Sequence, residues 1–167
     1  LTMTSMIPLV DPNEPNNTLA TATAITSGDT LEGAMIDPGG DEDFYVFTGT
    51  AGYSVNAQTL PVDGVTMDTK LYLLSSDSTE LAFDDDGGEG FLSWIRGYVL
   101  PSTGTYYLKA TGYSSSTTGS YNIELDALAP SSHAGTVVVN EIMQNPSAVS
   151  DSYGEYVELN NAGTTAI

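Results

Sequence analysis

The stretch GTYYLKATGYSSSTTGSYNIEL, residues 104–125, determines the fold class. In both halves of the stretch an apolar residue stands at every second position: Tyr106 and Leu108, then Tyr121, Ile123 and Leu125. This period of two is typical of a β-strand with one face buried. The Thr-Thr-Gly run at 117–119 is a turn signal, because glycine tolerates the backbone angles of tight turns. The stretch therefore predicts two strands, over 105–111 and 120–126.

Six further segments upstream are β-prone and lie between polar, glycine-containing turn signals. They are residues 30–34, 44–48, 53–60, 70–74, 81–83 and 92–100. Short strands that recur about every 8–12 residues indicate an antiparallel sandwich or barrel. No amphipathic helix of useful length is present. Residues 20–25 could form one helical turn, although their threonines disfavour it.

The composition excludes several classes of protein. The 167 residues include 3 basic and 22 acidic side chains, a net charge of −19, and no cysteine. Such a charge repels phosphates, which argues against a nucleic-acid partner and against anionic membrane surfaces. No apolar run approaches the ~18 residues that a transmembrane helix needs, so we expect no membrane insertion. The absence of cysteine excludes disulfides, a thiolate zinc site and a cysteine nucleophile.

The acidic residues suggest a divalent cation. Glu14, Asn16 and Asn17 lie on a proline-containing segment, and Asp41 and Asp43 stand at the start of a predicted strand. Ca²⁺ takes about 6–8 oxygen ligands from carboxylates, amides and backbone carbonyls. Both groups together supply these ligand types. The alternative interpretation is an acidic surface that is solvated and maintains solubility.

A second acidic run occupies residues 84–89, with the sequence DDDGGE. Three consecutive carboxylates repel each other unless they are solvated or bound to a cation. We interpret the run as an exposed acidic hairpin turn, with calcium binding as the less favoured alternative. Asp68 is interpreted as a turn or strand-edge residue.

The sequence offers little material for catalysis. His133 is the only histidine, and it lies in a segment of small residues, whereas a catalytic triad needs a preorganised support. A glycosidase would need a cleft with two facing carboxyl groups, which short strands and short loops do not favour. Exposed tyrosines on a sheet face are instead a common binding surface for peptides and sugars. We therefore predict a binding module and not an enzyme.

The pattern changes along the chain and predicts four parts. They are an N-terminal linker or strand (1–10), a β-sandwich (11–126), a linker (127–135) and a further β segment (136–167). The last segment contains two β-prone runs, 137–142 and 156–159. Two strands are marginally stable in water, so the segment is predicted to be truncated or to use the strands of a partner.

Residues ~11–126 resemble the bacterial pre-peptidase C-terminal domain, a family that includes the collagen-binding domains of clostridial collagenases. The matching pieces occur in order: EPNNTLATAT (14–23), LEGAMI (31–36), DEDFYVF (41–47), YSVNAQ (53–58), DTKLYLL (68–74), ELAFDDD (80–86) and LPSTGTYYLKATGY (100–113) with GSYNIEL (119–125). The resemblance implies a compact, jelly-roll-like β-sandwich that accompanies an exported bacterial hydrolase. In the collagen-binding relatives calcium lies between the N-terminal linker and the turn before a strand. Carried over to this sequence, the implied ligands are Glu14, Asn16, Asn17, Asp41 and Asp43.

Residues 136–167 are similar to the opening of the lamin tail domain, which is an immunoglobulin-like sandwich. The similarity rests on VNEIM (139–143), Asn145-Pro146 and GEYVELN (154–160). The remaining strands of that fold are absent from the sequence. The resemblance therefore implies a partial immunoglobulin-like β segment.

Together these features predict a calcium-stabilised accessory module of a secreted or cell-surface bacterial protein. We expect it to mediate adhesion, or to target an exported hydrolase to its substrate or matrix. The expected partners are an extracellular protein or polysaccharide ligand, or neighbouring domains or subunits. The alternative hypothesis is a structural subunit of an extracellular filament or adhesin, assembled by β-strand complementation.

Overall fold

The computed structural model describes residues 10–130, 137–143 and 156–161, the last two ranges by their backbone alone. The chain forms two compact units, Leu1–Ala129 and Pro130–Ile167. Within the described residues, no helix has the length and apolar character that crossing a membrane requires. The predicted linker His133 lies outside the described residues.

Nine strands are described in the first unit, and they match the predicted segments closely. They are β1 Thr23–Ala24, β2 Asp29–Ile36, β3 Glu42–Gly49, β4 Ser54–Leu60, β5 Thr69–Ser75, β6 Glu80–Asp84, β7 Trp94–Val99, β8 Gly104–Gly112 and β9 Gly119–Leu128. All eight predicted strands upstream of the linker are present. The predicted 92–100 strand is shorter, because its first residues belong to a connection between the sheets.

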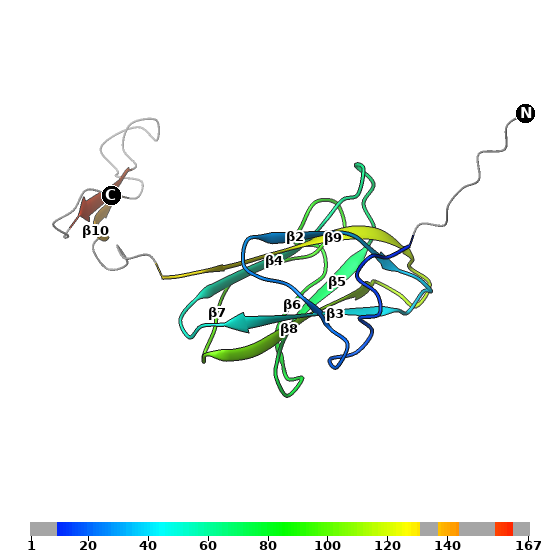
Figure 1. Ribbon diagram of the computed structural model, residues 1–167. Helices are drawn as coiled ribbons and strands as arrows, with labels where there is room; N and C mark the ends of the chain where they lie inside the picture. The colour runs from blue at the N-terminus through cyan, green and yellow to red at the C-terminus, as the bar shows by residue number, and fades with distance from the viewer. Residues whose placement is uncertain (1–9, 131–136, 144–155, 162–167) are drawn as a thin grey trace, which may run out of the picture. The chain divides into compact units, whose positions relative to one another are not determined.

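The strands form two layers, as Figure 1 shows. One sheet has the order β1-β3-β8-β5-β6 and the other has the order β2-β9-β4-β7. Neighbouring strands are antiparallel except β1, which runs parallel to β3. Strands adjacent in sequence commonly lie in opposite sheets, so the chain passes repeatedly from one layer to the other. The structure confirms the predicted all-β, antiparallel sandwich.

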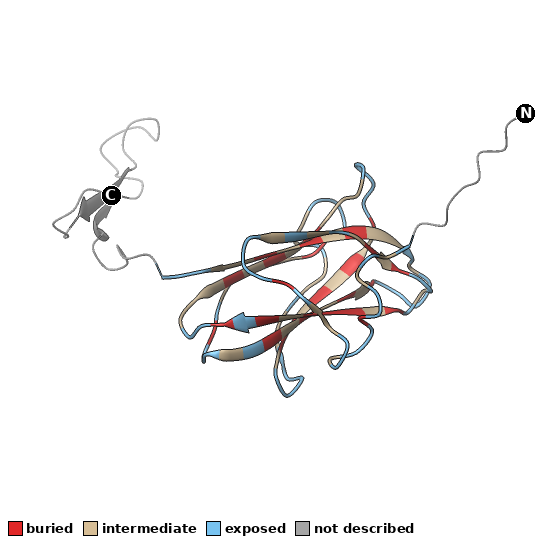
Figure 2. Cartoon of the chain, viewed as in Figure 1, coloured by how far each residue is buried: buried red, intermediate tan, exposed pale blue. Residues whose placement is uncertain are grey.

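The core lies between the two sheets. In β8 and β9 the side chains predicted to face inward are buried, and Figure 2 shows the buried positions alternating with accessible ones along the strands. Tyr106 is buried and Tyr107 faces the outer side of its sheet. Each large apolar side chain that is fully buried stabilises the fold by about 1.5–3 kcal/mol. The fully buried large side chains are Tyr45, Tyr106, Tyr121, Ile25, Ile36, Leu71, Leu73, Leu92, Leu100, Leu108, Ile123 and Leu125.

The helical turn considered for residues 20–25 is not formed. Thr23 and Ala24 instead pair in parallel with Tyr45 and Val46 of β3. The backbone N–H of Ile25 donates to the carbonyl oxygen of Val46 at 3.0 Å, and the Ile25 side chain is buried. Burial of Ile25 against the core therefore outweighs the weak local helix propensity.

The interpretation of residues 84–89 as a hairpin turn is wrong. β6 belongs to the five-stranded sheet and β7 to the four-stranded sheet, so the connection crosses from one layer to the other. Leu92 and Ser93 within it are fully buried. The hydroxyl of Ser93 donates to the carbonyl oxygens of Thr69 (2.7 Å) and Asp85 (3.0 Å). These buried contacts fix the crossing, and a local turn signal does not reveal them.

The second unit contains the two strands predicted there. β10 spans Val137–Met143 and β11 spans Tyr156–Asn161, and they pair antiparallel as a two-stranded sheet. The register shifts between Val139 and Glu141, which marks a β-bulge. The likeness of this segment to a lamin tail domain stays a prediction, and so do the bounds of the four predicted parts of the chain.

Candidate metal centre

The N-terminal segment is held on the sandwich by Asp11. Its Oδ2 accepts the backbone N–H of Met35 in β2 at 2.7 Å, and its Oδ1 accepts the N–H of Asn13 at 2.6 Å. The hydroxyl of Thr23 donates to the carbonyl oxygen of Asn13 at 2.8 Å. The sequence analysis did not single out Asp11. Its position in an Asp-Pro-Asn run was the available signal, because aspartate accepts a hydrogen bond from the backbone two residues on.

Asn16 ties the next part of the segment to β3. Its carbonyl oxygen accepts the N–H of Phe44 at 2.8 Å, and its own N–H donates to Oε2 of Glu14 at 2.8 Å. The Glu14–Pro15 peptide bond is cis. These contacts place the segment beside the first residues of β3, where the predicted aspartate ligands lie.

The 37–41 turn carries the other side of the centre. Its path needs glycine at position 39, because a Cβ there would lie 2.5 Å from the carbonyl oxygen of Ser115. Asp41 closes the turn by donating its N–H to the carbonyl oxygen of Pro38 at 3.0 Å. The Oδ1 of Asp41 accepts a hydrogen bond from the side-chain Nδ2 of Asn17 at 2.8 Å. The turn and the N-terminal segment are therefore joined through Asp41.

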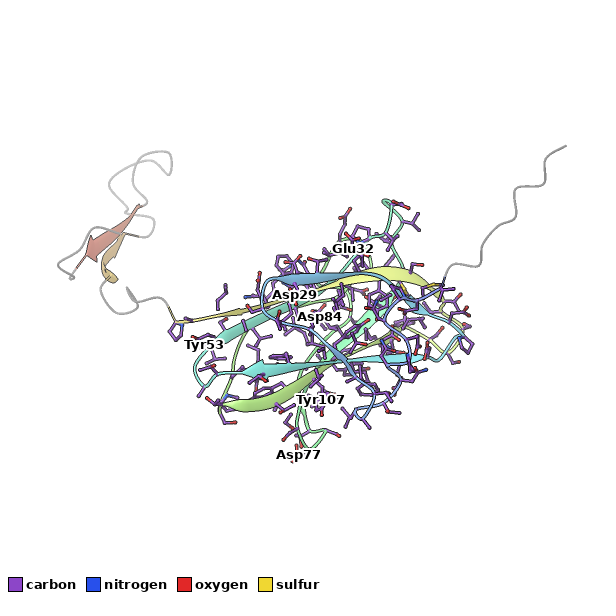
Figure 3. All side chains as sticks on the ribbon, in the orientation of Figure 1. Asp29, Glu32, Tyr53, Asp77, Asp84 and Tyr107 are labelled. Atoms are coloured by element: carbon purple, nitrogen blue, oxygen red, sulfur yellow. The ribbon has the colours of Figure 1, made fainter. Side chains whose placement is uncertain are left out.

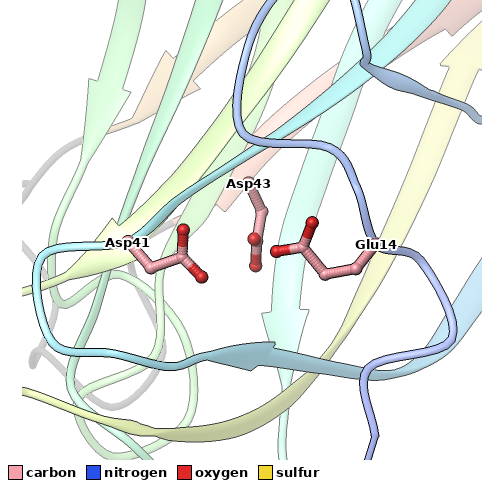
Figure 4. Close-up of side chains that lie close together, drawn as sticks. All are labelled: Glu14, Asp41 and Asp43. Carbon is pink, nitrogen blue, oxygen red and sulfur yellow. The ribbon is translucent and has the colours of Figure 1, made fainter.

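Three carboxylates converge between the segment and the turn. Glu14, Asp41 and Asp43 each offer an oxygen, and these oxygens all lie within 4.8 Å of one another. Figure 4 shows the three side chains pointing toward one another from the N-terminal segment and the start of β3. Asp43 is 0% exposed and Asp41 is 7% exposed, whereas Glu14 is exposed. The cluster thus opens to solvent on the Glu14 side.

No basic side chain neutralises the cluster among the described residues. Lys109 pairs with Glu42 at 2.9 Å, which is the salt bridge formed in this part of the chain. The other two basic residues, Lys70 and Arg96, donate to the carbonyl oxygens of Tyr113 and Gly87. The carboxylates therefore repel each other at close range, and a cation would remove this repulsion.

The environment of Asp43 disfavours its ionised form. Burial, together with the charges of Asp41, Asp11 and Glu14, raises the pKa of Asp43 to about 8. A hydrogen bond from the Tyr121 hydroxyl acts in the opposite direction and favours the ionised carboxylate. A bound cation would favour the ionised form in the same way.

Buried polar atoms at the centre lack partners. Asn16 is 0% exposed, and neither Nδ2 nor Oδ1 of its side chain has a hydrogen-bond partner among the described residues. The Oδ1 of Asp43 is likewise buried and without a partner there. Burial of such groups without compensation is costly, so they favour an additional binding partner. An adjoining hollow of about 160 Å³ is lined by Val10, Asp11, Glu14, Met35 and Asp37.

The structure brings all five predicted ligand residues to one place. Glu14, Asp41 and Asp43 form the carboxylate cluster, Asn16 lies buried beside Glu14, and Asn17 contacts Asp41. Asn17 turns its amide nitrogen toward Asp41, and exchanging the nitrogen and oxygen of that amide would present an oxygen there. Three carboxylates with amide oxygens are the donor set that Ca²⁺ prefers. The residues fit the predicted cation, and the ligand set stays a prediction.

A second acidic cluster contains Asp68, Asp85 and Asp86. One carboxylate oxygen of each lies within 4.8 Å of the others, and burial followed by the charges of Asp86 and Asp85 raises the pKa of Asp68. Asp84, labelled in Figure 3, is not part of it. Its Oδ1 accepts hydrogen bonds from the N–H of Gly87 at 2.8 Å and of Trp94 at 2.7 Å. The sequence analysis missed this cluster, because Asp68 joins residues 85 and 86 only through the path of the connection between the sheets.

Other acidic side chains follow the alternative interpretation of a solvated surface. Asp77 is exposed in the turn between β5 and β6, and Figure 3 shows it at the edge of the molecule. A hydrogen bond from the Ser75 hydroxyl lowers the pKa of Asp77. The Thr26 hydroxyl lowers the pKa of Asp29 in the same way. These carboxylates are stably ionised and need no cation.

The fold and the acidic centre together define a β-sandwich with a candidate cation site at one edge. Residues 41–112 match the bacterial pre-peptidase C-terminal domain family. This match confirms that part of the predicted resemblance. The matched residues span strands β3 to β8 of the sandwich.

One curated relative is a "probable subtilase-type serine protease" of Deinococcus radiodurans. It is 38% identical over 105 residues, which is 61% of this chain, and the chain spans 14% of that protein's length. Among solved structures, the pre-peptidase C-terminal domain of collagenase from Bacillus anthracis is 19% identical, with a TM-score of 0.48 over 63% of this chain and 94% of that one. The periplasmic g-type lysozyme inhibitor PliG of Aeromonas hydrophila is 12% identical, with a TM-score of 0.44 over 63% and 96%.

Proposed function

We propose that the first unit is an accessory module whose N-terminal segment is fastened to the sandwich by Ca²⁺. The observation that carries this proposal is the convergence of three carboxylates, one of them with a buried oxygen, Oδ1 of Asp43, that is unpartnered among the described residues. The adjacent residue Asn16, whose backbone N–H donates to Glu14, also has a buried and unpartnered amide there. A cation there would neutralise the carboxylates and supply a partner for the buried oxygen of Asp43. Because only the folded chain brings these groups together, Ca²⁺ would stabilise it, by about 2.7 kcal/mol at a hundredfold excess over Kd.

The test compares thermal unfolding of the full chain in millimolar Ca²⁺ and in chelator. We expect a higher melting temperature with Ca²⁺ and a loss of this difference in Asp41→Asn. The matched control is Asp85→Asn, which removes a carboxylate from the second cluster and should keep the response. Equal melting temperatures of the wild-type chain in both conditions would exclude the calcium role. If only Asp85→Asn loses the increase in melting temperature with Ca²⁺, the cation binds at the second cluster and not at the proposed site.

The accessory role follows from the family match together with the relative's protease name. We expect the parent protein to be exported, with this unit outside the cell and its chemistry located in another domain. The unit would then mediate adhesion, or target a hydrolase to an extracellular protein or polysaccharide. The net charge of −19 agrees with these partners and disfavours nucleic acid.

A groove on the open side of the sandwich is the surface we assign to such a partner. Its volume is about 500 Å³ and it lies between β6 and β7, the edge strands of the two sheets. Phe83, Trp94 and Tyr98 line it, and Phe83 is 45% exposed. Exposed aromatic side chains supply large contact areas at binding surfaces.

Sedimentation of the chain with insoluble protein fibres and with insoluble polysaccharide tests this surface. We expect Phe83→Ala to reduce binding to whichever material the wild-type chain binds. Phe91→Ala is the matched control, because Phe91 is 62% exposed and does not line the groove. Absence of binding to either material, or equal losses in both variants, would contradict the assignment.

The second unit supports the alternative function, assembly by strand complementation. Its described residues form only the two-stranded sheet of β10 and β11, which is marginal in water by itself. Strands from a neighbouring molecule would complete it. Light scattering of the purified chain distinguishes the two functions: oligomers that grow with concentration support assembly, and a strict monomer contradicts it.

A further inference from the structure

The buried carboxylate of Asp43 is held from the opposite sheet. The hydroxyl of Tyr121 in β9 donates to Oδ2 of Asp43 in β3. β9 belongs to the four-stranded sheet and β3 to the five-stranded sheet, so this hydrogen bond crosses the core. The other carboxylate oxygen of Asp43 has no partner among the described residues.

The hydroxyl of Tyr121 is itself held by a second hydroxyl, that of Tyr45. The Oη atoms of Tyr45 and Tyr121 are 2.9 Å apart, and both side chains are 0% exposed. Tyr45 stands two residues after Asp43 in β3, and so faces the same side of its sheet. The three side chains form a buried chain, from Tyr45 to Tyr121 to Asp43. No solvent is available to these hydroxyls, so their orientation depends on one another.

The carboxylate of Asp43 belongs both to this hydrogen-bonded chain and to the acidic cluster. Oδ2 is occupied by Tyr121, and the carboxylate is thereby prevented from rotating. A carboxylate oxygen of Asp43 remains in the cluster with Glu14 and Asp41. Groups that orient a metal ligand without touching the metal typically change metal affinity by about tenfold to a hundredfold.

From this geometry we infer that Tyr121 is a positioning residue for the cation site, supported by Tyr45, and that it couples cation binding to the packing of the two sheets. The inference rests on the proposed calcium function. Tyr121 does not contact the cation, and it acts through Asp43. Binding at the N-terminal segment therefore stabilises the contact between the two layers as well as the segment itself.

The test measures Ca²⁺ affinity of the full chain by titration calorimetry and stability in chelator by urea unfolding. Tyr121→Phe removes one hydroxyl from the core and should weaken Ca²⁺ binding about tenfold or more. The matched control is Tyr106→Phe, which also removes a buried hydroxyl, one that donates to the carbonyl oxygen of Ser102 at 2.7 Å. The control should lose stability in chelator and keep its Ca²⁺ affinity.

A double-mutant cycle shows whether Tyr121 acts through Asp43. In an Asp43→Asn background, Tyr121→Phe should cause no further loss of the residual Ca²⁺ affinity, because the positioned carboxylate is already absent. Additive losses would mean that Tyr121 acts by another route and would overturn the inference. If Tyr121→Phe does not fold, Tyr45→Phe replaces it, with a smaller expected loss of Ca²⁺ affinity, because Tyr45 acts on Asp43 only through Tyr121.

The outcomes separate the inference from the function on which it rests. Wild-type binding with unchanged affinity in Tyr121→Phe overturns the positioning role and leaves the calcium function standing. Equal affinity losses in Tyr121→Phe and Tyr106→Phe also overturn it, because the effect is then general to the core. Absence of Ca²⁺ binding by the wild-type chain overturns both.

Discussion

Replacement of Asp43 by asparagine should stabilise the chain in chelator and strongly weaken its response to Ca²⁺. Asp43 is 0% exposed, and burial raises its pKa from 3.8 to about 8. The folded chain therefore holds a proton on Asp43 at neutral pH, which the unfolded chain releases. An asparagine side chain at this position would remove this penalty and would still offer an oxygen to the Tyr121 hydroxyl.

The sign and size of the effect follow from proton linkage. Because the unfolded state binds fewer protons, stability falls as the pH rises from about 4 to about 8, and it is constant outside this range. Each pH unit corresponds to about 1.4 kcal/mol, so at pH 7 the penalty is about 4 kcal/mol. Asp43→Asn should recover up to this amount in chelator. Ca²⁺ must displace the proton, so its apparent affinity for the wild-type chain should fall about tenfold per pH unit below 8.

Urea unfolding in chelator at pH 5, 7 and 9 measures the effect, with the wild-type chain, Asp43→Asn and Glu80→Gln compared. Glu80 is exposed at the start of β6, so its variant should follow the wild-type chain at every pH. The wild-type chain should lose stability between pH 5 and pH 9 and the Asp43 variant should lose less. If the wild-type chain is equally stable throughout, or if Asp43→Asn is the less stable protein at pH 7, the reasoning about the buried carboxylate is refuted.

Three other predictions test the parts around the site. Asp11→Ala removes the acceptor for the Met35 N–H, so it should weaken Ca²⁺ binding several-fold in calorimetry; unchanged affinity would show that the segment does not need this clamp. Gly49→Ala places a Cβ 2.3 Å from a methyl group of Leu100, and the overpacking should cost about 1–3 kcal/mol in urea unfolding without changing Ca²⁺ affinity. Ser93→Ala removes the hydroxyl that donates to the carbonyl oxygens of Thr69 and Asp85. This loss should lower the free energy of unfolding, measured with urea, by about 1–3 kcal/mol. Wild-type stability in either of the last two variants would contradict the packing described.

The sandwich was predictable because its strands alternate strongly. Tyr121 and Ile123 face the core at a period of two, as the sequence indicated. The two-residue strand β1 was not predictable, since it forms by pairing with β3, which is distant in the sequence. The path of residues 85–93 was misinterpreted for the same reason: buried Leu92 and Ser93 decide it, and the acidic turn signal beside them does not.

The residue types of the candidate site were predictable, but the contacts between its residues were not. The carboxylate and amide residues stood out as ligand types, and the family resemblance joined the two groups. The sequence did not indicate that Asn17 and Asp41 contact each other, or that Tyr121 reaches Asp43 from the other sheet. Contacts of this kind depend on which strands the fold places opposite one another. The cluster of Asp68 with residues 85 and 86 was missed because a sheet crossing brings it together.

The position of the N-terminal segment has a consequence for the solubility of the protein. The segment and β1 lie along the outer edge of β3, where the N–H of Phe44 donates to Asn16. Without the segment, β3 would present unpaired backbone groups to the solvent, and such edges recruit strands from other molecules. The residues that hold the N-terminal segment on β3 therefore also reduce the tendency of the five-stranded sheet to aggregate. In chelator, where the segment loosens, intermolecular strand pairing should begin at β3.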